Sequence, residues 1–245
     1  MSSRERSLRL SAVLETVTTT AMLLASAAMI WYVWTVIGHR GAGSISGAGV
    51  RPEPVEDVAG NGWALSLDGA PRLGSAQTGP VLIEFSDFEC PFCRRHAQRT
   101  LDDLKAKLID PGRVVYAYRH LPLENHVRAL PAAIAAQCGF EQHKFWEMHA
   151  RLFAGSGLSR EEFVQAARDV NLDLRKFTVC LSKESPRVKS DLAEAERFGI
   201  RSTPTFLLGV LRADGRVSVH RKIRGAQSLE VFAGQIEKLS AAANR

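Results

Sequence analysis

Residues 81–93, VLIEFSDFECPFC, decide the fold. They open with a β-branched and aromatic run typical of a buried strand, and they close with Cys90 and Cys93. The next segment has the spacing of a helix with one apolar face, formed by Ala97, Leu101, Leu104 and Leu108. Residues 113–119 then return to a strand pattern. The sequence therefore predicts a βαβ unit with a parallel strand pair, and it places the two cysteines where the first strand meets the helix.

Beyond this unit, the chain alternates between strand and helix patterns. Residues 63–67 predict a short edge strand, residues 128–198 are helical throughout, and residues 205–208 and 217–223 are strands before a final helix. Helix starts inside the block are predicted at the N-capping residues Ser159, Asp173 and Ser185. We expect an α/β domain over residues 63–245 with a helical domain inserted at about 128–198.

Two cysteines separated by two residues can form a redox centre, half of a zinc site or a haem attachment site. Haem attachment requires histidine directly after the second cysteine, and Arg94 stands there. A zinc site needs two more ligands, and His96 is the one candidate close by. We therefore expect redox chemistry, with no metal and no cofactor.

The position of the pair assigns a role to each cysteine. Pro91 suits the first position of a helix, so Cys90 lies where unpaired backbone N–H groups and the helix dipole stabilise a thiolate. Cys93 lies one turn further in, on the apolar face. We expect Cys90 to exchange with substrate and Cys93 to resolve the mixed disulfide.

Residues 84–93, together with the distant segment Thr203-Pro204-Thr205-Phe206, resemble the DsbA-like thioredoxin-fold family. The resemblance covers about residue 79 to the C-terminus. It implies a thioredoxin-like fold with a helical insertion, protein thiol:disulfide exchange, and a cis peptide bond at Thr203–Pro204 that packs against the cysteine pair. Backbone groups beside a cis proline can pair with a substrate strand. The alternative is an ordinary trans proline that opens a strand.

The resemblance also implies an acid at Glu84. A buried carboxyl has a raised pKa and can accept the proton of Cys93. The alternative is that Glu84 points to solvent at a sheet edge. Phe92 departs from the best-known oxidase members, which have histidine at that position. Because phenylalanine cannot stabilise a thiolate as a cation, the motif leaves the direction of electron flow open.

The two remaining cysteines, Cys138 and Cys180, fall in the helical block. Related chains can carry a disulfide there, so we expect a structural disulfide, and two free buried cysteines are the alternative. Four histidines show no spacing typical of a metal site: His120, His126, His143 and His149.

The N-terminus predicts where the domain works. Residues 17–37 carry no charge and would span about 32 Å as a helix, enough for the hydrocarbon core of a membrane. Arginines lie mainly before this run, so the positive-inside rule puts residues 1–16 in the cytoplasm and the rest outside. A cleaved signal peptide is the alternative, but its apolar region would be shorter. Residues 38–62 are rich in glycine and are predicted as a flexible linker.

The net charge of +6 is scattered among acidic residues, which gives no basic patch for nucleic acid. The sequence predicts a membrane-anchored, extracytoplasmic thiol:disulfide oxidoreductase. It would oxidise thiols of exported proteins and be reoxidised by a DsbB-like or similar membrane partner. The alternatives are a reductase or isomerase kept reduced by a membrane electron carrier, and a redox-inert module that binds peptides.

Overall fold

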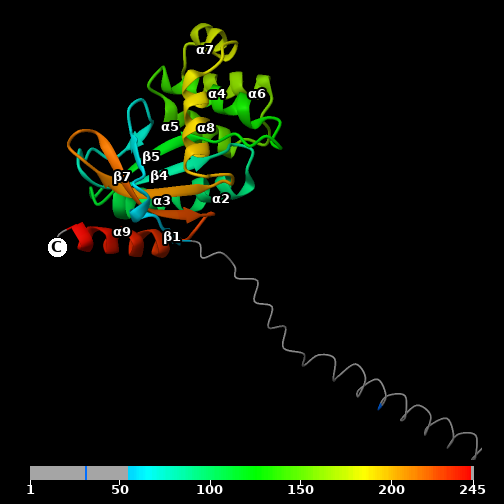
Figure 1. Ribbon diagram of the computed structural model, residues 1–245. Coiled ribbons are helices and arrows are strands. Elements are labelled where there is room, and N and C mark those ends of the chain that lie inside the picture. Colours follow the sequence, from blue (N-terminus) through cyan, green and yellow to red (C-terminus); the bar gives the residue numbers. More distant parts are fainter. Residues whose placement is uncertain (1–30, 32–54, 244–245) are drawn as a thin grey trace, which may run out of the picture. The chain divides into compact units, whose positions relative to one another are not determined.

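The computed structural model describes Trp31 and residues 55–243 (Figure 1). Within that part of the chain, no helix has both the length and the apolar character needed to cross a membrane. The predicted cytoplasmic segment (1–16), the predicted anchor (17–37) apart from Trp31, and the linker up to residue 54 lie outside the described residues.

The strands of the described residues form one mixed sheet. Its strands are β1 (Val55–Asp57), β2 (Ala64–Ser66), β3 (Arg72–Leu73), β4 (Gly79–Ser86), β5 (Val115–His120), β6 (Thr205–Leu211) and β7 (Arg216–Arg224). Their order is β1-β7-β6-β4-β5-β3, and β2 pairs with β7 beside β1. The β4–β5 pair is parallel, as the sequence predicts, and the other pairs are antiparallel. Strand β4 is therefore central, which explains its apolar sequence.

Helices cover both faces of this sheet (Figure 1). They are α2 (Pro91–Arg99), α3 (Leu101–Leu104), α4 (Ala129–Phe140), α5 (Phe145–Ala154), α6 (Arg160–Asp169), α7 (Leu174–Leu181), α8 (Pro186–Arg197) and α9 (Leu229–Ala243). Helices α3 and α9 pack on the face that carries Leu82 and Tyr116. The end of α8 packs on the opposite face, against Ile83 and Phe85.

Helices α4 to α8 are inserted between β5 and β6, where the sequence predicts a helical domain. Their core is apolar and includes Phe145, Met148 and Phe163. The same cluster continues to Cys90 and Cys93. The insertion therefore packs directly against the cysteine pair instead of forming a separate unit.

Local differences from the prediction include the helix after the cysteine pair and the first strand. The sequence predicts a single helix after the cysteine pair. In the structure this segment consists of α2 and α3, which are separated at Thr100, and a wider helical turn at Lys105–Ile109. The wider turn buries the consecutive side chains of Leu108 and Ile109. Residues Val55–Asp57, within the range predicted as linker, pair with β7 and belong to the sheet. Their polar sequence suits a short edge strand with little side-chain burial.

Candidate active site

The cysteine pair lies where the sequence predicts it, at the junction of β4 and α2. Cys90 is the N-capping residue of α2, and Pro91 occupies the first turn. The backbone N–H of Cys90 donates to the carbonyl of Asp87 at 3.2 Å, which closes the turn between strand and helix. Both sulfurs are free thiols, and Cys93 is completely buried.

Hydrogen bonding stabilises the thiolate of Cys90. The pKa of Cys90 is lowered to about 5, chiefly because the Cys93 thiol donates to its sulfur. Burial opposes this effect, but the side chain of Thr203 and the backbone N–H groups of Cys93 and Phe92 lower the pKa further. At neutral pH Cys90 is therefore a thiolate, the form that exchanges with disulfides.

Cys93 has the opposite character. Burial raises the pKa of the Cys93 thiol far above its usual range, and the nearby charges of Glu84 and Cys90 raise it further. Cys93 therefore remains a thiol at neutral pH. To act as a nucleophile it must pass its proton to a nearby base.

The Thr203–Pro204 bond is cis, so the alternative of a trans proline is wrong. Although Thr203 lies 113 residues from Cys90 in sequence, its carbonyl oxygen is 3.4 Å from the Cys90 sulfur, close enough to accept a hydrogen bond when Cys90 is protonated. Thr203 and Pro204 precede β6, the strand next to β4, and this adjacency brings the two distant motifs together.

Glu84 lies in the middle of β4, between β5 and β6, and its side chain is 1% exposed. It does not point to solvent at a sheet edge. Burial raises the pKa of its carboxyl to about 7, although a hydrogen bond donated by the Tyr116 hydroxyl works in the opposite direction. A carboxyl that titrates near neutrality beside Cys93 can exchange a proton with that thiol.

One titratable residue near the thiolate has no signal in the sequence. The Nδ1 of His126 lies 2.7 Å from the Oδ2 of the buried Asp87. This hydrogen bond raises the pKa of His126, and the negative charge of Cys90 raises it as well. His126 comes from the loop before α4, 36 residues after Cys90, so only the fold brings this histidine close to the sulfur.

Three other histidines, His96, His120 and His149, are buried, and burial lowers the pKa of each to about 3, 4 and 3. They are therefore neutral at physiological pH. Within the described part of the chain, no group of three or more potential ligand side chains is arranged to hold a metal ion.

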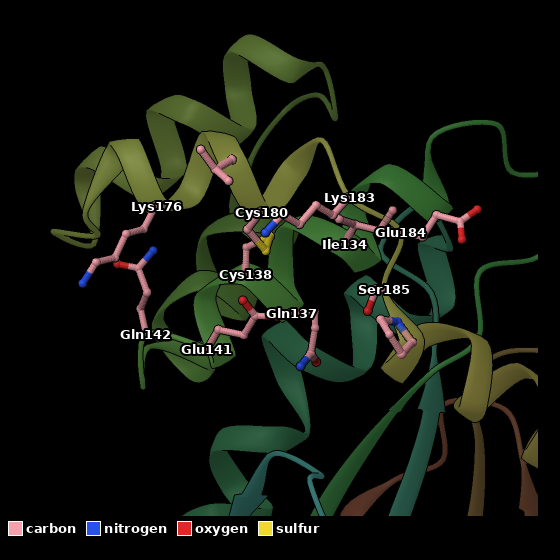
Figure 2. Close-up of a pocket in the computed structure, with 12 residues that line it drawn as sticks. Ile134, Gln137, Cys138, Glu141, Gln142, Lys176, Cys180, Lys183, Glu184 and Ser185 are labelled. Atoms are coloured by element: carbon pink, nitrogen blue, oxygen red, sulfur yellow. A yellow bond between two sulfur atoms is a disulfide. The ribbon is translucent and has the colours of Figure 1, made fainter.

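Cys138 of α4 and Cys180 of α7 form a disulfide (Figure 2). It borders a cleft of about 530 Å³, whose other lining residues include Glu141, Gln142 and Lys176. Cys90 and Cys93 do not line this cleft. The disulfide therefore joins two helices of the insertion at a place separate from the candidate active site.

Comparisons with known proteins agree with this geometry. A family model described as Thioredoxin matches residues 66–237. Alpha-DsbA1 from Wolbachia pipientis has a TM-score of 0.62 with 23% identity over 73% of this chain and 94% of that one. A thioredoxin-like oxidoreductase from Silicibacter pomeroyi DSS-3 has a TM-score of 0.57 with 26% identity over 70% of this chain and 92% of that one.

A different kind of relative is similar in sequence. A Na(+)/H(+) antiporter, NhaA 1 of Mycobacterium sp. (strain KMS), is 35% identical over 154 residues, which is 60% of this chain. The chain spans 25% of that antiporter's length. The likeness therefore concerns only a part of the antiporter.

Proposed function

From the premise that the chain belongs to the thioredoxin family and has its DsbA-like fold, we propose that it is an extracytoplasmic thiol:disulfide oxidoreductase that oxidises cysteine pairs of exported proteins. The observation that carries the proposal is the asymmetry of the cysteine pair. Cys90 has a pKa of about 5, whereas that of Cys93 is raised far above the usual range. A stabilised thiolate favours the reduced form, so the disulfide form of such a pair readily accepts electrons.

In the oxidising direction, a substrate thiolate attacks the Sγ of Cys90 in the Cys90–Cys93 disulfide. The disulfide breaks, and Cys93 leaves as a thiolate that takes the proton of Glu84. A second substrate thiolate then attacks the substrate sulfur of the mixed disulfide, and Cys90 leaves as a thiolate. The substrate loses two electrons and becomes a disulfide, and the Cys90–Cys93 pair becomes a dithiol.

The surroundings of Cys90 support a polypeptide substrate. Three large apolar side chains are exposed in the described part of the chain near this site: Phe92 is 53% exposed, Val127 80% and Leu130 49%. The backbone N–H of Arg128 donates to Glu89 at 2.7 Å, which holds the Val127 loop beside the residue that precedes Cys90. Exposed apolar groups around a reactive sulfur suit unfolded segments of protein.

The proposal includes a membrane location. Residues 17–37 would anchor the chain with the domain outside the cytoplasm, and a DsbB-like or similar membrane partner would reoxidise Cys90 and Cys93. The likeness to part of a Na(+)/H(+) antiporter supports use of such a domain close to a membrane. Membrane fractionation of cells that express the full chain tests the anchor, since a cleaved chain would be found in the soluble fraction.

The enzymatic proposal is tested with the oxidised full chain and a reduced peptide that contains two cysteines. We expect stoichiometric formation of the peptide disulfide, loss of this activity in Cys90→Ser, and a trapped peptide adduct on Cys90 in Cys93→Ser. A double variant, Cys138→Ala with Cys180→Ala, is the matched control and should retain activity. Inactive wild-type protein that still binds the peptide would support a redox-inert binding module instead.

A further inference from the structure

A buried hydrogen-bond chain continues from the carboxyl of Glu84 to two further side chains. The Tyr116 hydroxyl donates to Oε2 of Glu84, and the Nε2 of His96 lies 3.1 Å from the same hydroxyl oxygen. All three side chains are 0–1% exposed. They come from different elements: Glu84 from β4, Tyr116 from β5 and His96 from α2, the helix that carries Cys93.

The number of protons on each side chain determines which group donates and which accepts in these hydrogen bonds when Glu84 is ionised. A tyrosine hydroxyl has one proton, and Tyr116 gives it to the ionised carboxylate. The Nε2 of His96 must then donate its N–H to the Tyr116 oxygen. His96 is neutral, because burial lowers its pKa to about 3, so while Glu84 is ionised the single proton of the His96 ring lies on Nε2.

A neighbouring tyrosine shows that this arrangement is specific. Tyr118 follows on the same strand, is equally buried and lies directly opposite Glu84 in the sheet register. Its hydroxyl has no hydrogen-bond partner among the described residues, whereas that of Tyr116 contacts both Glu84 and His96. The two tyrosines therefore form a matched pair that differs in the contact to the carboxyl.

We propose that Tyr116 and His96 are positioning residues that hold the Glu84 carboxyl in its acceptor state while it exchanges a proton with Cys93. This inference rests on the proposed function of the cysteine pair and extends it to two side chains that do not touch the sulfurs. When Cys93 attacks Cys90 in a mixed disulfide, its proton moves to Glu84. The hydrogen bond from Tyr116 favours the carboxylate that receives this proton.

Several titratable groups surround Glu84 and must be separated in any pH profile. Strand β5 contributes Tyr116 and Tyr118, helix α2 contributes Cys93 and His96 with Cys90 at its start, and α5 contributes His149, packed on the Tyr118 ring. Strand β6 places the apolar Phe206 opposite Glu84 in the sheet register, and Phe232 of α9 packs on the Phe206 ring. Since the histidines are neutral and the tyrosine pKa values are raised, Glu84 is the group expected to titrate near neutrality.

The test uses the reduced full chain and the chromogenic disulfide dithiobis(nitrobenzoic acid) in a stopped-flow instrument. In the first phase the Cys90 thiolate takes one aromatic thiol and releases the other. In the second phase the Cys93 sulfur attacks Cys90, its proton passes to Glu84, and the second aromatic thiolate leaves. The cysteine pair is oxidised by two electrons and the reagent is reduced by two.

In wild type we expect the second phase to accelerate as pH rises through about 7, because Glu84 must be ionised to accept the proton. Tyr116→Phe should move this midpoint to higher pH and slow the second phase at pH 7 roughly fivefold, because a pKa shift of about one unit lowers the ionised fraction of Glu84 at pH 7 from about one half to about one eleventh. The first phase should be unchanged. Tyr118→Phe is the matched control and should keep the wild-type midpoint.

His96 is tested by a pair of substitutions. His96→Phe removes the N–H that orients Tyr116 and should shift the midpoint in the same direction as Tyr116→Phe. His96→Gln retains a side-chain N–H and should restore the wild-type midpoint. The unchanged first phase shows in each variant that the protein is folded around Cys90.

An unshifted midpoint in Tyr116→Phe would overturn the inference, and so would an equal shift in Tyr118→Phe. Glu84→Gln should remove the inflection near pH 7, and a Glu84→Gln profile like that of wild type would overturn the inference as well. Failure of the proposed function has a different signature, in which both phases occur but the oxidised chain does not oxidise a dithiol peptide.

Discussion

Cys90 and Cys93 are only two residues apart, yet their surroundings move the pKa values of their thiols in opposite directions. Cys90 accepts hydrogen bonds at the start of α2, whereas Cys93 is enclosed by apolar side chains and a nearby carboxyl. The sequence predicts this difference, because the position of Pro91 and the apolar face of the helix are local signals. The sequence cannot predict that His126 contacts Asp87 or that Tyr116 contacts Glu84, because these contacts depend on loop and strand positions that only the fold brings together.

The thiolate of Cys90 can be observed directly. The rate of alkylation of the reduced protein by iodoacetamide should rise with pH around a midpoint of about 5, because only the thiolate reacts. Mass spectrometry identifies the alkylated cysteine, and Cys93 should remain unmodified over this range. A midpoint near the usual thiol value of about 8.5 would contradict the stabilisation of the thiolate.

His126 should contribute part of that stabilisation. His126→Asn removes a cation that the Cys90 charge favours, so the alkylation midpoint should rise by roughly 0.2–0.7 unit, the effect of a partly exposed charge pair. His143→Asn, which changes an exposed histidine between α4 and α5, serves as the control and should leave the midpoint in place. Equal midpoints in all three proteins would show that His126 does not stabilise the Cys90 thiolate.

At the scale of elements, local sequence signals predict helix starts well and sheet edges poorly. Ser159 forms a capping box with Glu162, and Asp173 and Ser185 cap the next two helices, as the sequence predicts. Strands β1 and β3 escape prediction because three- and two-residue edge strands are too short to show alternation. They are held by pairing with β7 and β5, which is a long-range property.

The Cys138–Cys180 disulfide joins α4 to α7 across a sequence separation of 42 residues. Its removal by Cys138→Ala with Cys180→Ala should lower the free energy of unfolding by about 2–4 kcal/mol, since closing a loop of this length restricts the unfolded chain. Urea denaturation of the oxidised proteins measures the change. An unchanged unfolding midpoint would show that α4 and α7 do not need this link.

At the scale of the whole molecule, the α/β sheet with an inserted helical domain could be predicted because both motifs and the helical block lie in sequence order. The packing of the insertion against the active site could not, because it depends on the contacts of Cys93 and Tyr118 with apolar residues of α4 and α5. This packing buries Cys93, whose thiol pKa is also raised by the nearby charge of Glu84, so it links the electrostatics of the site to the stability of the whole domain.

That link predicts how stability depends on pH. Because the folded pKa of Glu84, about 7, is above the unfolded value of about 4.5, its stabilising contribution is present at low pH and is lost as pH rises through 7. Wild type loses this contribution between pH 4.5 and pH 8, whereas Glu84→Gln has no carboxyl to titrate. The free energy of unfolding of Glu84→Gln minus that of wild type should therefore increase by about 3 kcal/mol over this range. Urea denaturation at several pH values measures this difference, and a constant difference would show that Glu84 does not titrate in this window.

The central claim is that Cys90 and Cys93 form an oxidising pair, and the reduction potential tests it most directly. The full chain is equilibrated with glutathione buffers, quenched in acid, and the thiols of the Cys90–Cys93 peptide are quantified by mass spectrometry. The low pKa of Cys90 predicts a potential near or above about −180 mV, at which the pair takes electrons from substrate thiols. A potential near about −270 mV would contradict the account and identify the pair as a reductant.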